Sequence, residues 1–340
     1  MMMYKMFFKT VLTAFILIFL CSSCNSGPNP VKVFILAGQS NMSGHGEMEA
    51  GEKGNLTWLM KNTDNPRFKK LMDDKGEWTR RNDVFIYTAN NKVSFSIKGE
   101  DNFTFGPLSA GYGAYKHTIG PELMFGNVLG DYYDEDILII KTAWGSKSLG
   151  HNFLSPSAIN KPGYVPGIPK DEGYYYKKMM DIISKVLGNI GEYVPGYQGQ
   201  GYQIVGFGWH QGWNDRGDEK FVAKYTDNLK CLINDVRKDL NEPELPFVIA
   251  TTSMDLSTEY PLSLKLVEAQ KAIVNFPEFK ENIGIVDTKG FFKKPEDSPS
   301  KKQNYHWYRN AGSYCEIGEA MGEMMWKLTK DSNKNAKIRK

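Results

Sequence analysis

The segment V-K-V-F-I-L-A-G-Q-S-N-M-S-G, from Val31 to Gly44, determines how the rest of the chain is interpreted. Its β-branched and aromatic residues up to Leu36 are typical of a strand buried on both faces of a sheet. Gly38 ends this apolar run. Because open parallel sheets bind ligands at the carboxyl ends of their strands, Ser40 is a candidate nucleophile. A serine here is also a common helix cap, so the pattern alone leaves both roles open.

The remaining sequence alternates between short apolar runs and segments with helical spacing. Predicted strands cover residues 31–37, 84–87, 137–142, 204–209, 247–252 and 283–287, and predicted helices cover 120–132, 174–190, 221–240, 262–275 and 314–329. This alternation predicts one α/β domain over residues 31–330, in which helices cover both faces of a mostly parallel sheet. Long irregular segments at 47–82 and 90–118 are rich in aromatic residues, which favours a role in lining a site.

The composition indicates a folded domain and argues against a nucleic-acid partner. Hydrophobic residues make up 41% of the 340 residues, enough for a sizeable core. The 42 basic residues nearly balance the 39 acidic ones, and the excess lies in the polar basic tail, residues 331–340.

The first 24 residues are typical of a secretory signal. Lys5 and Lys9 precede an apolar core at residues 11–20, which ends in C-S-S-C. This end is similar to a bacterial lipoprotein cleavage box, so we expect lipidation of Cys24 and a flexible tether at residues 25–30. The protein would then be exported and held on a bacterial membrane, facing the periplasm or the cell surface. An ordinary cleaved signal peptide is the alternative.

Two cysteines remain for the folded domain, Cys231 and Cys315. Their spacing matches no disulfide framework or metal motif, and we expect buried free thiols. The folded domain holds no CxxC pair and no HExxH helix, so its sequence predicts no zinc site and no other cofactor.

Three predicted strands or loops lead into unusually polar segments. The strand at 137–142 is followed by A-W-G-S-K-S, the strand at 204–209 by H-Q-G-W-N-D, and the last loop contains Y-H-W-Y-R-N at 305–310. Because the carboxyl ends of parallel strands meet at one edge of the sheet, we expect these segments to lie around Ser40.

Five blocks resemble the SGNH hydrolase superfamily and, within it, the sialate O-acetylesterase-like carbohydrate esterases. They are G-Q-S-N-M at 38–42, I-G-P-E-L at 119–123, K-T-A-W-G-S-K-S-L at 141–149, W-H-Q-G at 209–212 and the segment around His306. The resemblance implies a three-layer α/β/α, flavodoxin-like fold and hydrolysis of O-acetyl esters on sugars. It also implies that Ser40 is the nucleophile and His306 the general base.

The chemistry of these residue types agrees with the resemblance. An imidazole that takes the serine proton makes the hydroxyl nucleophilic and then returns the proton to the leaving alcohol. The negative oxygen of the tetrahedral intermediate needs rigid donors. Our candidates for this oxyanion hole are the backbone N–H groups of Ser40 and Gly145 and the side-chain amide of Gln211.

The sequence departs from the family at two acidic positions. Gln303 stands where many members have an aspartate three residues before the histidine, and Trp213 stands where many have an acidic residue after W-H-Q-G. Asp215 is the first candidate for the triad acid. Asp297, Glu296, or a serine–histidine dyad supported by a backbone carbonyl are the alternatives.

Other residues have a functional and a structural interpretation. We expect Asn41, His210 and Trp144 to contact substrate, although a histidine at a strand end is often a wall residue and some of the tryptophans belong to the core. His45, His117 and His151 are interpreted as loop histidines, and Glu122 as a helix cap.

The sequence therefore predicts an exported serine esterase that removes acetyl groups from carbohydrates such as sialic acid or xylan. One alternative is a surface lipoprotein that binds glycans without hydrolysis. Another is an esterase that acts on acyl esters other than those of sugars.

Overall fold

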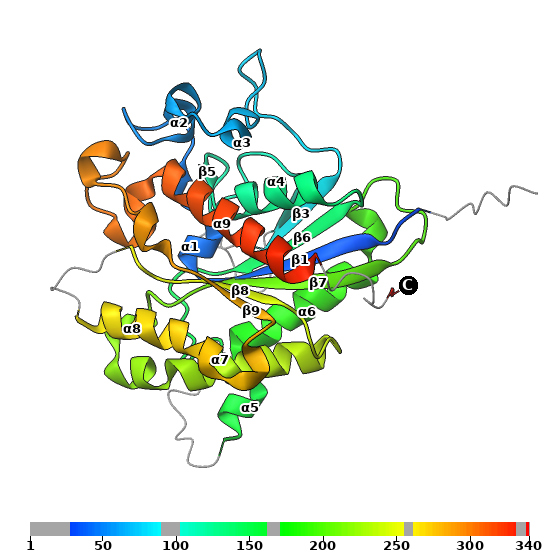
Figure 1. Cartoon of the computed structure of the whole chain (residues 1–340), viewed down its shortest axis with the longest axis vertical. Helices are drawn as coiled ribbons and strands as arrows, with labels where there is room; N and C mark the ends of the chain where they lie inside the picture. Colours follow the sequence, from blue (N-terminus) through cyan, green and yellow to red (C-terminus); the bar gives the residue numbers. More distant parts are fainter. Residues whose placement is uncertain (1–27, 90–102, 162–170, 255–260, 331–337, 340) are drawn as a thin grey trace, which may run out of the picture.

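The computed structural model describes residues 28–89, 103–161, 171–254, 261–330 and 338–339. Its core is a seven-stranded sheet of order β4-β3-β6-β1-β7-β8-β9 (Figure 1). The strands are β1 (Val31–Gly38), β3 (Val84–Ala89), β4 (Phe103–Pro107), β6 (Ile137–Ala143), β7 (Tyr202–His210), β8 (Phe247–Ala250) and β9 (Ile283–Val286). All neighbours pair in parallel except β4, which is antiparallel to β3. A separate two-stranded ribbon joins β2 (Gly46–Glu47) to β5 (Thr118–Ile119).

Helices cover both faces of this sheet, as Figure 1 shows. One layer holds α2 (Leu56–Asn62), α3 (Pro66–Lys69), α4 (Glu122–Tyr132) and α9 (Ala311–Thr329). The other holds α5 (Pro156–Ile159), α6 (Tyr174–Gly188), α7 (Glu219–Asp239) and α8 (Pro261–Lys271). The short α1 (Ser40–Ser43) follows β1 directly. Single 3₁₀ turns connect these elements at η1 (Ile190–Glu192), η2 (Asp215–Gly217), η3 (Ala272–Asn275), η4 (Pro277–Phe279), η5 (Thr288–Phe291), η6 (Pro295–Asp297) and η7 (Asn304–Arg309).

The apolar run of β1 feeds both layers because successive side chains of a strand point to opposite faces. Val33 and Ile35 belong to the core under α6 and α7, whereas Phe34 and Leu36 belong to the core under α4 and α9. The strand is buried along its whole length. This confirms the α/β fold with a mostly parallel sheet that the sequence predicts.

All six predicted strands and five predicted helices are present, with small shifts at their ends. The last helix begins at Ala311 instead of residue 314, because the side chain of Asn310 caps it by accepting from the Ser313 N–H. Strand β4 was not predicted; it lies in a segment interpreted as irregular and adds an antiparallel edge to the sheet.

Helices α4 and α9 pack closely because two glycines of α9 face α4. A Cβ on Gly318 would lie 2.2 Å from the Pro121 carbonyl oxygen, and one on Gly322 would lie 2.8 Å from Cβ of Val128. The small residues thus bring α9 against the start of α4, which lies beside the site described below.

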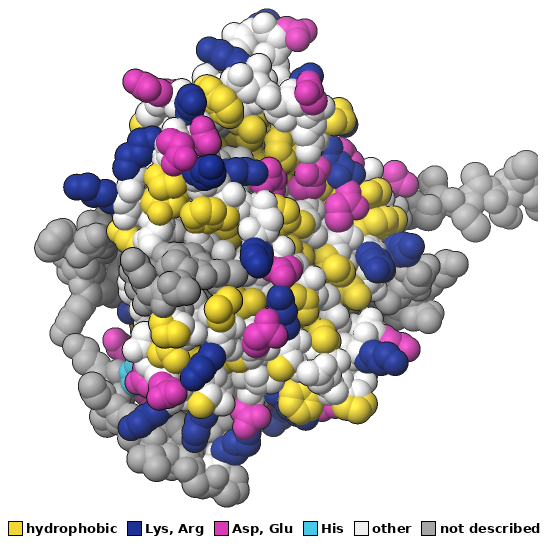
Figure 2. Space-filling view, turned by 60° about the vertical axis from the view of Figure 1, so that its left-hand side comes forward, with side chains coloured by type: hydrophobic (Ala, Val, Ile, Leu, Met, Phe, Trp, Pro, Cys, Tyr) yellow, Lys and Arg dark blue, Asp and Glu magenta, His cyan; other side chains and the backbone are white. Residues whose placement is uncertain are grey.

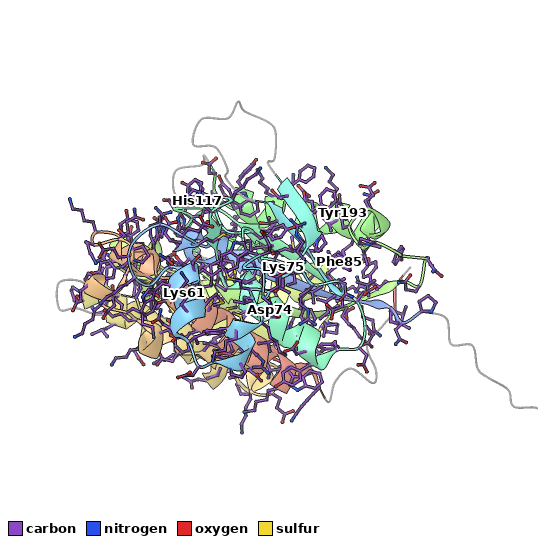
Figure 3. The ribbon with its side chains drawn as sticks, turned by 90° about the horizontal axis from the view of Figure 1, so that it is seen from above. Lys61, Asp74, Lys75, Phe85, His117 and Tyr193 are labelled. Atoms are coloured by element: carbon purple, nitrogen blue, oxygen red, sulfur yellow. The ribbon has the colours of Figure 1, made fainter. Side chains whose placement is uncertain are left out.

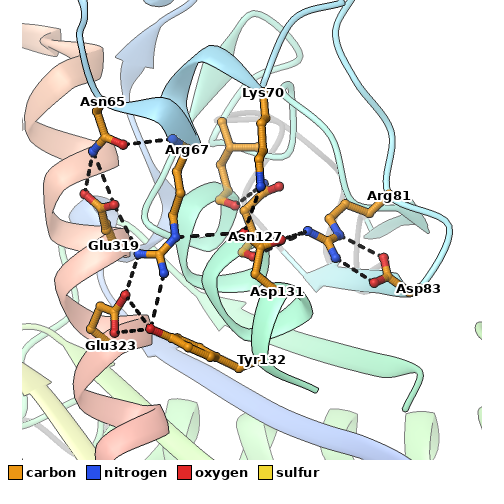
Figure 4. A network of polar contacts seen from close by, with 11 residues as sticks. Asn65, Arg67, Lys70, Arg81, Asp83, Asn127, Asp131, Tyr132, Glu319 and Glu323 are labelled. Atoms are coloured by element: carbon orange, nitrogen blue, oxygen red, sulfur yellow. Dashed lines mark hydrogen bonds and ion pairs between the residues drawn. The ribbon is translucent and has the colours of Figure 1, made fainter. Parts of the chain in front are cut away.

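A network of charged side chains fastens the segment 47–82 to this helix layer (Figure 4). Arg67 of α3 pairs with Glu319 and Glu323 of α9, and Arg81 joins Asp83 to Asp131 of α4. The segment predicted to be irregular is therefore held in place by α3 and these ion pairs. Figure 2 shows basic and acidic side chains interspersed on one face of the molecule, in keeping with the formal charge of +3.

Parts of the predicted domain plan lie outside the described residues, namely the signal peptide at 1–24 with Cys24, residues 25–27 of the tether, and most of the tail at 331–340. Arg339 of the tail is described, and its backbone pairs with Tyr202 at the start of β7. The two domain cysteines are free, as predicted, but only Cys315 is buried and Cys231 is half-buried. Among the described helices, none has the length and apolar character needed to cross a membrane.

Candidate active site

Ser40 lies at the carboxyl edge of the sheet, as the first residue of α1. The turn that places it requires glycine at position 38, where φ is 154° and a Cβ would lie 2.2 Å from the carbonyl oxygen of His210. The Gln39 N–H donates to that same oxygen at 3.3 Å. Ser40 keeps 9% of its surface exposed, while Asn41 and Gln39 keep 2% each. The predicted position of the serine is confirmed, and it is also the start of a helix.

Three buried polar contacts fix α1. Nζ of Lys141, on β6, donates to the Ser43 carbonyl at 3.0 Å, and the Ser43 hydroxyl donates to the Ala143 carbonyl at 3.1 Å. The Asn41 amide donates to the Tyr305 carbonyl at 3.0 Å. Since Tyr305 precedes His306, this last bond joins the serine helix to the histidine loop.

Lys141 forms a fully buried ion pair that the sequence did not reveal. Its Nζ lies 2.9 Å from Oε2 of Glu122 and also donates to the Tyr112 carbonyl at 2.6 Å. Burial raises the pKa of Glu122, and the ammonium of Lys141 opposes that shift. Glu122 stands at the start of α4 and accepts from the Gly120 N–H, so it does more than the capping we predicted.

Gln39 and Gln211 organise the loops on the other side of α1. Oε1 of Gln39 accepts from the backbone N–H groups of Gly212 and Asn214, both at 3.1 Å. Nε2 of Gln211 donates to the Lys147 carbonyl at 2.9 Å and to Asp215 at 2.5 Å. The two hydrogens of this amide are thus directed into the protein. In this arrangement Gln211 supports the loop that contains Gly145 and Lys147. Its amide is not free to donate to an oxyanion, so the geometry disagrees with our prediction that Gln211 belongs to the oxyanion hole.

Asp215 does not act on His306 in this structure. Its carboxylate accepts from the backbone N–H groups of Leu149 at 3.0 Å and Gly150 at 2.7 Å, in addition to Gln211. Burial raises its pKa to about 6, and the three N–H donors oppose the shift. The prediction of Asp215 as the triad acid therefore disagrees with the geometry, because its oxygens hold the loop that follows Gly145.

The alternative acids also point elsewhere. The carboxylate of Asp297 lies 3.6 Å from Lys53 and that of Glu296 4.0 Å from Lys294, and all four side chains are exposed. Within the described part of the chain, Nδ1 of His306 is buried and has no hydrogen-bond partner. Among the described residues, neither a carboxylate nor a backbone carbonyl accepts a hydrogen bond from Nδ1 of this imidazole.

His306 lies on η7, where the backbone adopts an unusual course. Three consecutive residues after it, Trp307, Tyr308 and Arg309, have φ values of 52°, 51° and 62°, a left-handed region that is unfavourable for side chains with a Cβ. The turn is held by Gln303, whose carbonyl accepts from the N–H groups of His306 at 2.9 Å and Tyr308 at 2.8 Å. Burial, together with the charge of Arg309, lowers the pKa of His306 to about 4.

Gly145 lies beside Ser40 as predicted. A Cβ on Gly145 would lie 4.0 Å from Cβ of Ser40 and would meet nothing else within that distance. A glycine here leaves open space next to the nucleophile. The first N–H groups of a helix have no hydrogen-bond partner within that helix. The N–H of Ser40, at the start of α1, is therefore available to a ligand.

The residues expected to contact substrate are buried. Asn41 is engaged by Tyr305 and by the Tyr314 hydroxyl at 2.9 Å. His210 is 1% exposed, and its Nδ1 lies 3.1 Å from the Ala250 carbonyl. Trp144 is 2% exposed and belongs to the core. We correct their assignment from sugar contacts to residues that build the wall of the site.

The other loop histidines lie on three different segments: His45 between α1 and β2, His117 directly before β5, and His151 between β6 and α5. His117 is exposed and stacks on Tyr115 with ring centroids 5.5 Å apart, and Figure 3 shows it apart from Phe85 of β3. In the part of the chain that the structure describes, no three His, Cys, Asp or Glu side chains form a group that could hold a metal ion.

The fold and the site define an α/β protein whose serine lies on the turn after the central strand, at the sheet edge where such proteins bind ligands. The chain belongs to the family described as carbohydrate esterase, sialic acid-specific acetylesterase, whose model matches residues 30–327. It is therefore a carbohydrate O-acetylesterase by family, as the sequence blocks predicted. A comparison with curated protein sequences gives no significant match.

Solved structures share the fold at low sequence identity. A protein of Arabidopsis thaliana matches with a TM-score of 0.53 and 18% identity, over 88% of this chain and 99% of that one. The carbohydrate acetylesterase XAC1771 of Xanthomonas citri matches with a TM-score of 0.51 and 13% identity, over 88% of this chain and 57% of that one. NanS matches with a TM-score of 0.51 and 13% identity, over 91% and 99%.

Proposed function

We propose that this chain hydrolyses O-acetyl esters of carbohydrates through an acyl-enzyme on Ser40, with His306 as general base. The observation that carries the proposal is the hydrogen bond from Asn41 to the Tyr305 carbonyl, which joins the helix of Ser40 to the loop of His306. Gly145 lies against the serine from a third element. Nucleophile, base and open backbone thus lie together at one edge of the sheet.

The reaction follows from the chemistry of these groups. Oγ of Ser40 attacks the acetyl carbon while Nε2 of His306 takes its proton. The N–H groups of Ser40 and Gly145 stabilise the negative oxygen of the intermediate, and each such donor is worth about 10²-fold or more in rate. The bond between the acetyl carbon and the sugar oxygen breaks, and the sugar hydroxyl leaves with the proton from His306. Water then attacks the acetyl-serine by the reverse roles and releases acetate.

The low pKa of His306 predicts how the rate of this reaction depends on pH. A general base has to be neutral, and a pKa of about 4 keeps the imidazole neutral in mildly acidic medium. We expect kcat/KM to be level from neutral pH down to about pH 5 and to fall below it.

We further propose that the enzyme is exported and lipid-anchored through Cys24. The basic start, the apolar core and the cysteine of residues 1–24 support this. Radiolabelled palmitate in a bacterial host should label the wild type, and Cys24→Ala should abolish the label. Label retained by the variant would refute the anchor.

The test of the esterase is acetate release from a panel of O-acetylated sialic acids, xylans and other glycans, together with an activated acetyl ester. Wild type should release acetate, and Ser40→Ala and His306→Ala should each lose at least about 10³-fold in kcat while they remain folded. Activity retained by Ser40→Ala would remove the serine from the mechanism. Binding of glycans without any hydrolysis would instead favour a non-catalytic role, and faster cleavage of long-chain esters would favour a substrate other than a sugar.

A further inference from the structure

His45 lies face to face with His306. The ring centroids are 3.8 Å apart and the planes differ by 7°, which is a parallel stack at van der Waals contact. His45 follows α1 and precedes β2, so its backbone belongs to the same rigid turn as Ser40. From the sequence alone, His45 is interpreted only as a loop histidine.

We propose that His45 is a positioning residue of the esterase, whose stacked imidazole holds His306 in the orientation that a triad carboxylate would otherwise fix. This inference rests on the proposed function of Ser40 and His306. It also accounts for the departure at Gln303, where many family members have the acid.

The need for such a support follows from Nδ1 of His306. For Nε2 to accept the serine proton, the ring hydrogen must be on Nδ1. In the described residues, that buried atom has no acceptor, and Asp215, Asp297 and Glu296 all bind other groups. A ring with no hydrogen bond at Nδ1 would rotate about its side-chain bonds unless packing prevents it.

The stack provides this packing from both sides. Tyr305 meets the ring of His306 at an angle of 67° with centroids 4.6 Å apart, and Tyr115 meets the ring of His45 edge-on at 5.9 Å. Tyr314 of α9 bonds to the backbone of His45 and to Asn41. His45 is therefore fixed by its main chain as well as by its ring.

Burial, reinforced by nearby cations, keeps both rings neutral. The groups facing the pair come from every element around it: Arg309 and Tyr305 of η7, Glu47 of β2, which pairs with Arg309, Lys141 of β6 with its partner Glu122 of α4, Tyr314 of α9 and Tyr115. Burial and the cations Arg309 and Lys141 lower the pKa of His45 to about 2. Two neutral rings can stack without charge repulsion, and His45 does not compete for the serine proton.

The test compares three variants with an activated acetyl ester. His45→Ala should lower kcat about 10- to 100-fold with KM within about twofold, because orientation and not binding is lost. His45→Phe keeps a flat ring and should remain within about fivefold of wild type in kcat. Asp227→Asn is the control, because Asp227 only forms an exposed ion pair with Lys161 away from the two rings, and it should leave kcat unchanged. Equal losses in His45→Ala and His45→Phe, or no loss in His45→Ala, would overturn the proposal.

The pKa of His306, followed by NMR through its ring protons, separates this proposal from the proposed function. Removal of the stacked ring admits water, so the pKa in His45→Ala should rise from about 4 toward 6.5, and the acid limb of kcat should move with it. This titration needs no turnover. If wild type were inactive but the pKa shifted as expected, the esterase mechanism would fail and the stacking role would stand. An unshifted pKa in His45→Ala would refute the stacking role itself.

Discussion

The buried pair of Glu122 and Lys141 allows the sharpest test of how this fold supports its serine. Glu122→Gln keeps the shape of the side chain and an oxygen that can accept from the Gly120 N–H. It removes the negative charge 2.9 Å from Nζ of Lys141, where both side chains are at most 1% exposed. At an effective dielectric of about 20, that separation corresponds to about 6 kcal/mol of attraction, which the desolvation of both ions partly offsets.

We expect Glu122→Gln to lower the free energy of unfolding by about 3–5 kcal/mol at pH 7, because an uncompensated ammonium stays buried. For a domain of about 300 residues this corresponds to a fall in Tm of about 5–8 °C. Urea denaturation followed by circular dichroism measures it. Asp227→Asn is the matched control: it breaks the exposed pair of Asp227 with Lys161 and should change stability by less than about 1 kcal/mol.

The double variant Glu122→Gln with Lys141→Met decides whether the loss comes from the pair. Met fills the volume without charge, so the double variant should recover at least about 1 kcal/mol relative to Glu122→Gln alone. It should still lower kcat, because Lys141 no longer donates to the Ser43 carbonyl at the end of α1. A loss of stability below about 1 kcal/mol in Glu122→Gln would refute the reasoning. So would strict additivity, in which the loss in the double variant equals the sum of the losses in Glu122→Gln and Lys141→Met.

Three further predictions concern the walls of the site. Gly145→Ala should change the free energy of unfolding by less than about 0.5 kcal/mol, since the added Cβ meets only Ser40. The same variant should lower kcat/KM about tenfold or more. Thermal melting checks the first expectation and ester hydrolysis the second. Asp215→Asn should lower stability by about 2 kcal/mol, because one acceptor replaces two, with less than about a 100-fold loss in kcat; a loss of about 10⁴ without destabilisation would restore Asp215 as the triad acid. His210 has its pKa lowered to about 4 by burial, so the unfolded state binds its proton first and stability falls as pH drops from about 6.5 to 4. Between pH 7 and 5, wild type should lose about 2 kcal/mol more than His210→Gln in denaturant titrations, and equal losses would contradict this.

The sequence predicted the sheet because its strands are local signals. The run from Val31 to Leu36 is apolar except at Lys32, and residues 137–140 and 247–250 are apolar throughout, as strands covered on both faces require. Strand β4 could not be predicted from its sequence, because its residues are only exposed or partly buried and pair with β3 at the edge of the sheet. Helix α1 escaped because four residues are too few for a period.

The serine could be located for the same reason, since a glycine and a strand end are local features. The groups that support His306 could not be predicted in this way. It depends on where the side chains of Asp215, Asp297 and His45 point once distant segments meet, and sequence spacing carries no such information. Lys141 shows the same limit, because a lysine in the middle of a strand signals exposure until its partner Glu122 is known.

These observations suggest one principle for the site. Its serine helix contributes one side chain, Met42, to the apolar core, and buried polar groups add three further attachments: Lys141 at the Ser43 carbonyl, Asn41 at the Tyr305 carbonyl and Gln39 at the Gly212 N–H. Each bond joins the turn to a different strand or loop, so the nucleophile is fixed relative to all of them at once. A buried polar network of this kind has directional bonds, which an apolar core lacks. We therefore expect variants in this polar network to lower kcat by a larger factor than they change KM. Variants in the apolar layers should lower the free energy of unfolding more than they lower kcat.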